Sequence, residues 1–319
     1  MKNLIVSVFI ISGIIAASSC GSRQQAKKGG LQGEISISGA FALYPLAVKW
    51  AEEFQNLHPG VRIDISAGGA GKGMTDVLAN VVDLGMVSRE IYPPETEKGA
   101  VAFAVAKDAV IATVNAQNPD LANLMKTGLT RDAAIKLWIT GEYTTWGQIT
   151  GTASTSAVHV YTRSDACGAA ETWALWMGKK QEDLGGTGVF GDPGLATAVQ
   201  KDVLAIGLNN IGYAYDETSR KPNPEMLPLP IDVNNNGKLD PEELFYDTKD
   251  SLITAIGEDR YPSPPARDLY LVSNGIPSNP AVVEFIRYVL TDGQKHNIPA
   301  GYISLSEEKL KKGLDLIEK

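Results

Sequence analysis

The sequence predicts an α/β fold with two lobes, each a mixed, mostly parallel sheet flanked by helices. Short strand-like apolar segments alternate with amphipathic helical ones through the first 90 residues, which is the pattern of parallel sheets. With 319 residues the chain exceeds one typical domain, so two lobes are expected. A proline-rich break at 261–265 precedes a strand that returns the chain to the first lobe.

The first lobe is assigned to residues 33–114 and 265–319, and the inserted second lobe to residues 115–264. Apolar residues recurring at helical or alternating spacing define each element. The expected strands are 35–37, 61–65, 82–87, 101–105, 110–114, 158–161, 204–215 and 269–272, and the expected helices are 45–57, 74–81, 129–149, 169–177, 282–290 and 307–316. Turn-forming residues at 115–119 predict the first crossover between the lobes.

The N-terminus has the pattern of an export signal. Lys2 precedes an apolar stretch that is too short to span a bilayer comfortably. Residues 17–20, Ala-Ser-Ser-Cys, resemble the lipobox of bacterial lipoproteins, whose cysteine is lipidated. We therefore expect a signal peptide at 1–19 and a tether at 20–32, lipidated at Cys20. An ordinary signal peptide with an incidental cysteine is the alternative.

The net charge of −8 at pH 7 argues against nucleic-acid binding, which needs a basic surface. A small anionic ligand is still compatible, because local amides and one or two arginines outweigh a distant net charge. If Cys20 carries lipid, Cys167 is the only other cysteine, so no intrachain disulfide is expected.

Three segments predict an anion site built from helix starts. Small residues precede a helix at 38–42, at 68–73 and at 162–171. The N–H groups of a first helical turn have no intrahelical acceptor, and the positive end of the helix dipole lies there. Arg163 stands just before the third start and offers a planar guanidinium to two ligand oxygens. A strand-end ion pair at the surface is its alternative role.

Together these segments make the chain resemble the phosphate-binding proteins of bacterial ABC importers, from about residue 33 to about residue 305. The segments that carry the resemblance are 38–50, 68–73, 82–85 with Ser88 and Arg89, 139–141 with Trp146, 163–168, 211–213, 293–294 and 301–302. The resemblance implies the type II periplasmic binding protein fold, in which two crossovers join the lobes and the ligand lies in the cleft between them.

By position, the resemblance also implies how a tetrahedral oxyanion is held. The ligand-binding residues it implies are Ala40, Phe41, Ala42, Gly69, Ala70, Gly71, Ser88, Arg89, Arg163, Asp165, Cys167, Gly168 and Ala169. Asp165 either accepts a proton from a protonated ligand oxygen or caps the following helix. The chain lacks the family's hydroxyl groups at Phe41, Ala42, Ala70, Cys167 and Ala169. Each lost hydroxyl removes a hydrogen bond worth roughly 1–3 kcal/mol.

A twelve-residue calcium loop is predicted at 232–243. Its oxygen ligands are Asp232, Asn234, Asn236, the carbonyl of Lys238, Asp240 and Glu243, with Gly237 at the bend. Prolines between 222 and 230 exclude an entering helix. We therefore expect a structural calcium site that pins an insertion around 228–248, and a polar turn is the alternative.

The predicted function is capture of phosphate or a related tetrahedral oxyanion for delivery to an ABC permease. The protein is expected to be a monomer, not an enzyme, and lipid-anchored on the periplasmic face of a bacterial membrane. Lobe closure around the ligand would present a surface to the permease.

Three alternatives to this function stay open. The same fold could bind a carboxylate or larger organic anion, with Phe41 as an apolar wall. The protein could be a calcium-stabilised envelope sensor or partner-binding protein without transport. It could also be an enzyme using Cys167, since a helix start lowers a thiol pKa.

Overall fold

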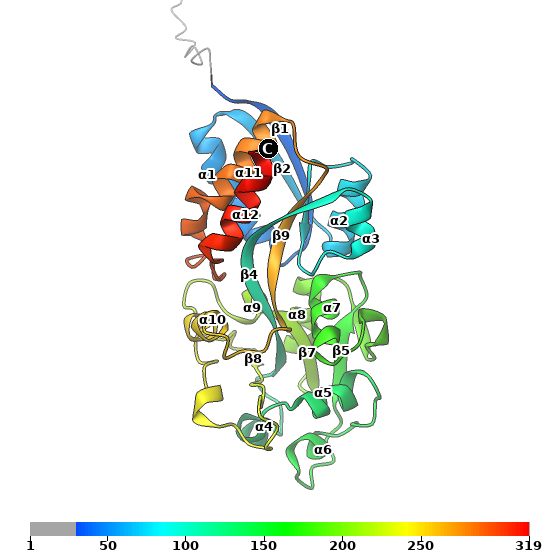
Figure 1. Ribbon diagram of the computed structural model, residues 1–319. Helices are drawn as coiled ribbons and strands as arrows, with labels where there is room; N and C mark the ends of the chain where they lie inside the picture. Colours follow the sequence, from blue (N-terminus) through cyan, green and yellow to red (C-terminus); the bar gives the residue numbers. More distant parts are fainter. Residues whose placement is uncertain (1–29, 319) are drawn as a thin grey trace, which may run out of the picture. The chain divides into compact units, whose positions relative to one another are not determined.

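A mixed β-sheet runs along the described part of the chain, residues 30–318 of a computed structural model (Figure 1). The predicted signal peptide, Cys20 and most of the predicted tether lie outside these residues. The strands are β1 (Gln32–Gly39), β2 (Gly60–Ala67), β3 (Leu84–Val87), β4 (Ala100–Asn115), β5 (His159–Arg163), β6 (Thr187–Val189), β7 (Ala205–Asn210), β8 (Met226–Pro228) and β9 (Ala266–Asn274). Their order in the sheet is β2-β1-β3-β9-β4-β7-β5-β6, with β8 beside β4.

Helices alternate with these strands, as the apolar periodicity predicts. They are α1 (Tyr44–Leu57), α2 (Ala70–Leu78), α3 (Pro93–Glu97), α4 (Leu121–Thr127), α5 (Arg131–Trp138), α6 (Trp146–Thr150), α7 (Gly168–Trp176), α8 (Asp192–Lys201), α9 (Ile211–Ala214), α10 (Lys249–Gly257), α11 (Pro280–Leu290) and α12 (Glu307–Ile317). Proline lies in the first turn of α1, α8 and α11, where its missing N–H costs no helical hydrogen bond.

Parallel pairing places several loops at common edges of the sheet. β1 pairs in parallel with β2 and β3, and β5 pairs in parallel with β6 and β7. β9 is antiparallel to β3 and β4, and β4 is antiparallel to β7. The loops that follow β1, β2 and β3 therefore emerge side by side, as at the ligand-binding edges of α/β sheets.

Two hydrophobic clusters lie along this sheet. The first, which we call the N-terminal cluster, contains Trp50 and Phe285 and gathers β1, β2, β3, α1, α2 and α11. The second, the central cluster, contains Trp138 and Trp173 and gathers β7, α5, α7, α8 and α10. β4 contributes residues 100–106 to the first cluster and 109–114 to the second, and β9 is likewise shared. These two strands run side by side from one cluster to the other (Figure 1).

The passage between the clusters differs from the prediction. We expected two strands, at 101–105 and 110–114, and a crossover at 115–119. The structure has one continuous strand, β4, that is already in the central cluster before Asn115. Lys107 and Asp108 interrupt the apolar run, but Asp108 lies directly opposite Arg267 of β9 in the ladder. Because Arg267 compensates the charge of Asp108 and Asp259 that of Lys107, the strand continues through both residues.

Two predicted elements are divided in the structure. The predicted helix at 129–149 is two helices, α5 and α6, because Gly141 between them adopts a φ of +66°, which a helix does not accept. The predicted strand at 204–215 is β7 followed by the short helix α9. β7 thus ends at Asn210.

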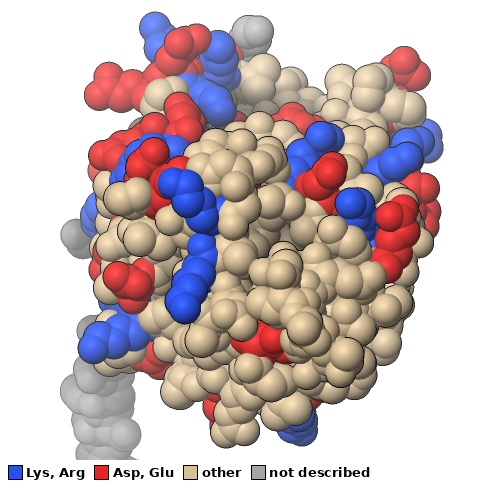
Figure 2. All heavy atoms as spheres, turned by 90° about the horizontal axis from the view of Figure 1, so that it is seen from below, with Lys and Arg blue, Asp and Glu red and all other residues tan. Residues whose placement is uncertain are grey.

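Charges of both signs are mixed on the face shown in Figure 2, around a wide uncharged area. This face carries no extended basic patch, in keeping with the negative net charge. Among residues 30–318, no helix combines the length and the apolar character that crossing a membrane requires.

Candidate functional site

Loops from the N-terminal cluster close onto the segment that follows β5. The N–H of Gly71, in the first turn of α2, donates to the carbonyl of Ala166 at 3.1 Å. A side chain on Gly69 would lie 3.0 Å from the carboxylate of Asp165. Gly69 also has a φ of +92°, so glycine is favoured here by both space and backbone conformation. The second predicted helix start therefore touches the third.

The loops after β1 and β3 reach the same segment. The ring of Phe41 lies 5.7 Å from the guanidinium carbon of Arg163. Ser88 packs so closely on Gly168 that any Cβ there would overlap the carbonyl and the hydroxyl of Ser88. The structure thus brings the three predicted loops together around residues 163–169.

Arg163 lies at the centre of this arrangement. It is the last residue of β5, and its side chain is fully buried. Its Nε donates to Oδ1 of Asp165 at 2.9 Å, and its Nη2 donates to Oδ2 at 2.6 Å. Its Nη1 lies 2.8 Å from Oδ1 of Asp192, an ion pair without hydrogen-bond geometry. Burial opposes the charged guanidinium, but the surrounding acidic groups outweigh burial and raise the pKa of Arg163. The alternative role, a strand-end ion pair at the surface, is right about the ion pair but wrong about the exposure, because the side chain is buried.

A buried polar chain connects Arg163 to the two strands that join the clusters. Oδ1 of Asp192 accepts a hydrogen bond from Nδ2 of Asn210 at 2.7 Å, and Oδ1 of Asn210 accepts one from Nη2 of Arg267. The same Nη2 lies 3.6 Å from Asp108. Burial raises the pKa of Asp108 to about 7 and also raises the pKa of Asp192.

Asp108, Asp192, Asn210 and Arg267 were not among the predicted site residues. One of them left a signal in the sequence, since Gly191-Asp192-Pro193 has the glycine, acid and proline of a helix start. That start is α8, which was not among the three predicted helix starts. The other three lie within or at the ends of strands, where nothing local marks them.

Several predicted amides are already bonded within the protein. The N–H groups of Ala40 and Gly69 donate to the carbonyls of Met86 and Gly39, at 2.9 and 3.1 Å. That of Cys167 donates to the side chain of Gln181 at 3.0 Å. With Gly71, four of the expected main-chain donors serve the loop–loop contacts instead. The predicted main-chain ligand positions that are not among these four donors are Phe41, Ala42, Ala70, Gly168 and Ala169.

Asp165 does not cap α7, so that alternative is wrong. The N-cap residue is Cys167, whose sulfur accepts a hydrogen bond from the N–H of Ala170 at 3.4 Å. Besides its two bonds from Arg163, Asp165 accepts one from the N–H of Gly191 at 3.0 Å. The carboxylate therefore ties β5 to the start of α8.

The expectation of an acidic thiol at Cys167 is also wrong. Burial raises the pKa of this thiol to about 12, although Arg163 and the hydrogen bond from Ala170 oppose the rise. Its side chain is almost entirely covered, which disfavours the thiolate. The enzyme alternative thereby loses its activated nucleophile.

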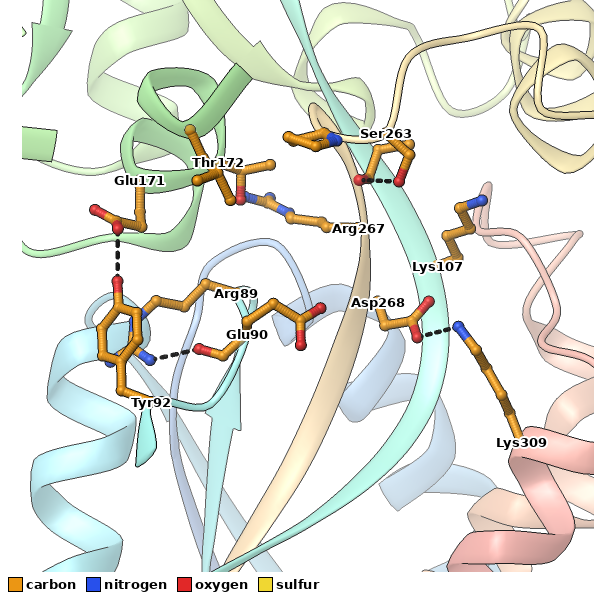
Figure 3. Close-up of a pocket in the computed structure, with 13 residues that line it drawn as sticks. Arg89, Glu90, Tyr92, Lys107, Glu171, Thr172, Ser263, Arg267, Asp268 and Lys309 are labelled. Carbon is orange, nitrogen blue, oxygen red and sulfur yellow. Dashed lines mark hydrogen bonds and ion pairs between the residues drawn. The ribbon is translucent and has the colours of Figure 1, made fainter. Parts of the chain in front are cut away.

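Arg89 is bound by residues of its own loop and of α3. Its guanidinium donates to both carboxylate oxygens of Glu95, at 2.7 and 2.9 Å, and lies 4.1 Å from the centre of the Tyr92 ring. Figure 3 shows Arg89 and Tyr92 beside a separate cavity of about 260 Å³, across which lie Arg267 and Lys309. Ser88 therefore packs on Gly168, whereas the side chain of Arg89, the next residue in the chain, binds Glu95.

The predicted calcium loop folds into a compact turn. Asp232 accepts hydrogen bonds from the N–H groups of Asn236 and Gly237, at 3.2 and 2.7 Å. Glu243 accepts one from the N–H of Val233 at 2.7 Å. Gly237 has a φ of +83°, as the predicted bend requires. Asp232 and Glu243 are both buried.

The side chains of this loop converge on Asp240. Its Oδ2 accepts hydrogen bonds from the amides of Asn234 and Asn236, at 2.9 and 2.7 Å, and its Oδ1 pairs with Lys238 at 2.7 Å. The hydrogen bond from Lys238, followed by those of the two amides, lowers the pKa of Asp240 to about 2. Across residues 30–318, no three acidic, histidine or cysteine side chains gather as metal ligands. A cation here would combine the carboxylates of the loop with amide and main-chain oxygens, a ligand set that suits calcium.

Comparison with known proteins places this geometry in a family. Residues 24–293 match the PBP superfamily domain. The chain belongs to the PBP superfamily. Two superfamily relatives that align over nearly the whole chain are phosphate-binding proteins PstS. That of Methanocaldococcus jannaschii is 24% identical, over 98% of this chain and 94% of its own length. That of Pseudomonas aeruginosa PAO1 is 26% identical, over 98% of each.

Solved structures of binding proteins share the fold. A putative phosphate ABC transporter substrate-binding protein from Clostridium perfringens, with bound phosphate, superposes with a TM-score of 0.70. It is 20% identical and covers 86% of this chain and 100% of its own. An ABC-type phosphate transport receptor from Vibrio cholerae gives a TM-score of 0.61 at 22% identity, covering 85% and 100%. The predicted type II binding-protein fold is confirmed.

Proposed function

We propose that this PBP superfamily protein captures phosphate, or a related tetrahedral oxyanion, beside Arg163 and delivers it to an ABC permease. The observation that carries the proposal is the meeting of three loops from the N-terminal cluster with residues 163–169, around a buried arginine. The full-length relatives named phosphate-binding protein PstS support the ligand class. The role is that of a binding protein and not of an enzyme.

We further propose that the two hydrophobic clusters correspond to the two predicted lobes, 33–114 with 265–319 and 115–264, except that residues 109–114, Ala266 and Ile303 belong with the second lobe because they pack in the central cluster. The contacts of Gly71 with Ala166 and of Ser88 with Gly168 then join opposite lobes. Ligand exchange would require these contacts to break, and β4 with β9 would act as the hinge. Lipid anchoring at Cys20 of an extracytoplasmic monomer belongs to the same proposal and is supported by the sequence of residues 17–20.

Isothermal titration with phosphate, arsenate, sulfate and molybdate tests the function. One site with a preference for phosphate or arsenate is expected. Sulfate should bind at least about tenfold more weakly, because near neutral pH it has no proton to donate to the carboxylates around Arg163. Absence of binding for all four ions would overturn the oxyanion proposal.

A specific contact favours the organic-anion alternative. The rings of Phe41 and Phe190 meet edge to face at 6.2 Å, next to Arg163. An aromatic pair beside a guanidinium suits a carboxylate that carries an apolar group. Benzoate and citrate in the same titration distinguish the alternatives, since tighter binding of either than of phosphate would favour the organic ligand.

We also propose a structural calcium ion in the 232–243 loop. The buried carboxylates of Asp232 and Glu243 and the convergence on Asp240 support it. Calcium at 100 times its dissociation constant should raise the free energy of unfolding by about 2.7 kcal/mol, as measured by urea denaturation. Glu243→Gln should abolish this gain, and Glu242→Gln, at a position that supplies no predicted ligand, should keep it. Absence of calcium binding at millimolar concentration would contradict the proposal.

A further inference from the structure

We infer that Tyr92 and Glu171 form a latch that holds the two proposed lobes closed from outside the anion site. Tyr92 is then a positioning residue for anion binding, which strengthens binding without touching the anion. The inference rests on the proposed function and deepens it. It names a contact that sets how tightly the closed lobes retain an anion, whichever anion that is.

A side-chain hydrogen bond joins the two proposed lobes at the latch. The hydroxyl of Tyr92, the residue before α3, donates to Oε1 of Glu171 in the first turn of α7, at 2.6 Å (Figure 3). Burial and this hydrogen bond raise the pKa of Tyr92, so the hydroxyl keeps the proton that it donates. Hydrogen bonds from a hydroxyl to a carboxylate are among the stronger ones in proteins. The bond forms only when the two lobes meet.

Contacts within the first lobe hold Tyr92 in position. Its N–H donates to Oε2 of Glu95 at 2.9 Å, and the guanidinium carbon of Arg89 lies 4.1 Å from the centre of its ring. Arg89 in turn donates to both carboxylate oxygens of Glu95. These contacts lie within residues 89–95, so they do not depend on lobe closure. Little side-chain freedom is therefore lost when the bond to Glu171 forms.

Glu171 is anchored to the loop beside Arg163. Its second carboxylate oxygen, Oε2, accepts a hydrogen bond from the N–H of Gln181 at 3.0 Å. The side chain of Gln181 donates to the carbonyl of Asp165 at 2.6 Å and accepts a hydrogen bond from the N–H of Cys167 at 3.0 Å. Gln181 thus fixes both the carboxylate of the latch and the main chain at 165–167. Closure at the latch therefore positions this loop against the loops of the first lobe.

A cavity lies beside the latch, between the two proposed lobes. Tyr92 and Glu171 line this cavity of about 260 Å³ on one side, and Lys107 of β4 and Asp268 of β9 line it on the other (Figure 3). Because side chains do not fill this space, the lobes can part here without disrupting a packed core. Tyr92 is 39% exposed, so water replaces the hydrogen bond once the lobes separate, and its net contribution is modest.

Loss of the latch should weaken binding of every anion by the same factor. The apparent affinity for an anion that is held between closed lobes is proportional to the closed fraction of the ligand-free protein. Tyr92→Phe removes the hydroxyl and keeps the ring beside Arg89. The closed fraction should fall about three- to tenfold, as expected for a partly exposed hydrogen bond to a carboxylate. The dissociation constant for phosphate should rise by that factor.

The test is isothermal titration with inorganic phosphate and with arsenate, applied to the unaltered protein, Tyr92→Phe, Glu171→Ala and the double variant. When Glu171 is already alanine, Tyr92→Phe should change the dissociation constants by less than about twofold, because the hydroxyl has lost its acceptor. The urea midpoint of ligand-free Tyr92→Phe should match that of the unaltered protein. Tyr143→Phe is the matched control, since the ring of Tyr143 lies beneath Lys136 and packs against the central cluster, within one proposed lobe.

Each outcome decides the inference. Unaltered affinities in Tyr92→Phe, or an equal effect of this change with and without Glu171, would overturn the latch while the proposed function stands. A changed ratio of phosphate to arsenate affinity, or a lower urea midpoint, would overturn it too, because Tyr92 would then act on the anion or on folding. Absence of binding by the unaltered protein would overturn the proposed function and the inference together. Circular dichroism checks folding, and Tyr92→Leu replaces Tyr92→Phe if the latter does not fold.

Discussion

Replacing Arg163 with methionine is expected to abolish anion binding and to lower the free energy of unfolding by about 3–5 kcal/mol. The side chain is fully buried between Asp165 and Asp192. Its removal leaves two buried carboxylates without the cation that they share. Isothermal titration with phosphate measures the first effect, and urea denaturation measures the second.

Two further variants separate charge from geometry at this position. Arg163→Lys keeps the charge but loses the planar fork that donates to both oxygens of Asp165, so an intermediate loss of both properties is expected. Arg62→Met removes an arginine whose side chain is 70% exposed and should cost less than about 1 kcal/mol. Unchanged stability and phosphate affinity in Arg163→Met would contradict the central place of Arg163.

Replacing Gly168 with alanine is expected to weaken phosphate binding by at least about tenfold. The added methyl group would overlap the carbonyl and hydroxyl oxygens of Ser88, and packed backbone segments do not yield by that much without moving apart. Because Ser88 and Gly168 belong to opposite proposed lobes, the strain is relieved by opening and not by unfolding. The free energy of unfolding should therefore change by less than about 1 kcal/mol.

Gly212→Ala provides the matched control for this variant. Gly212 lies in α9, and a Cβ there would have no heavy atom within 4 Å. Titration and urea denaturation should give wild-type values for it. Wild-type phosphate affinity in Gly168→Ala would show that closure of Ser88 onto α7 is not part of binding.

Local pattern accounts for most of the predicted elements. Leu46, Trp50 and Phe54 recur at helical spacing, and all three are buried on α1. The helix starts at Ala70 and Gly168 lie where small residues precede apolar runs. Such features depend on neighbours a few residues away, which the sequence displays directly.

Burial, in contrast, reversed a prediction made from local position. The start of α7 alone would lower the thiol pKa of Cys167, yet the packed interior raises it to about 12. Arg89 follows β3 and Arg163 is the last residue of β5, and the sequence does not show which of the two arginines is enclosed by the loops. Glu95 in α3 binds Arg89, whereas the loops that close over residues 163–169 enclose Arg163.

From the sequence alone came the α/β class, the two proposed lobes, the glycine-rich helix starts and the place of Arg163 before one of them. Only the tertiary structure showed that Asp192 shares that arginine and that Asn210 and Arg267 connect it to β4 and β9. These partners come from β5, α8, β7 and β9, which are distant in the chain and become neighbours through sheet order. Spacing along a chain records periodicity within an element, but it does not record which strand ends meet across a sheet.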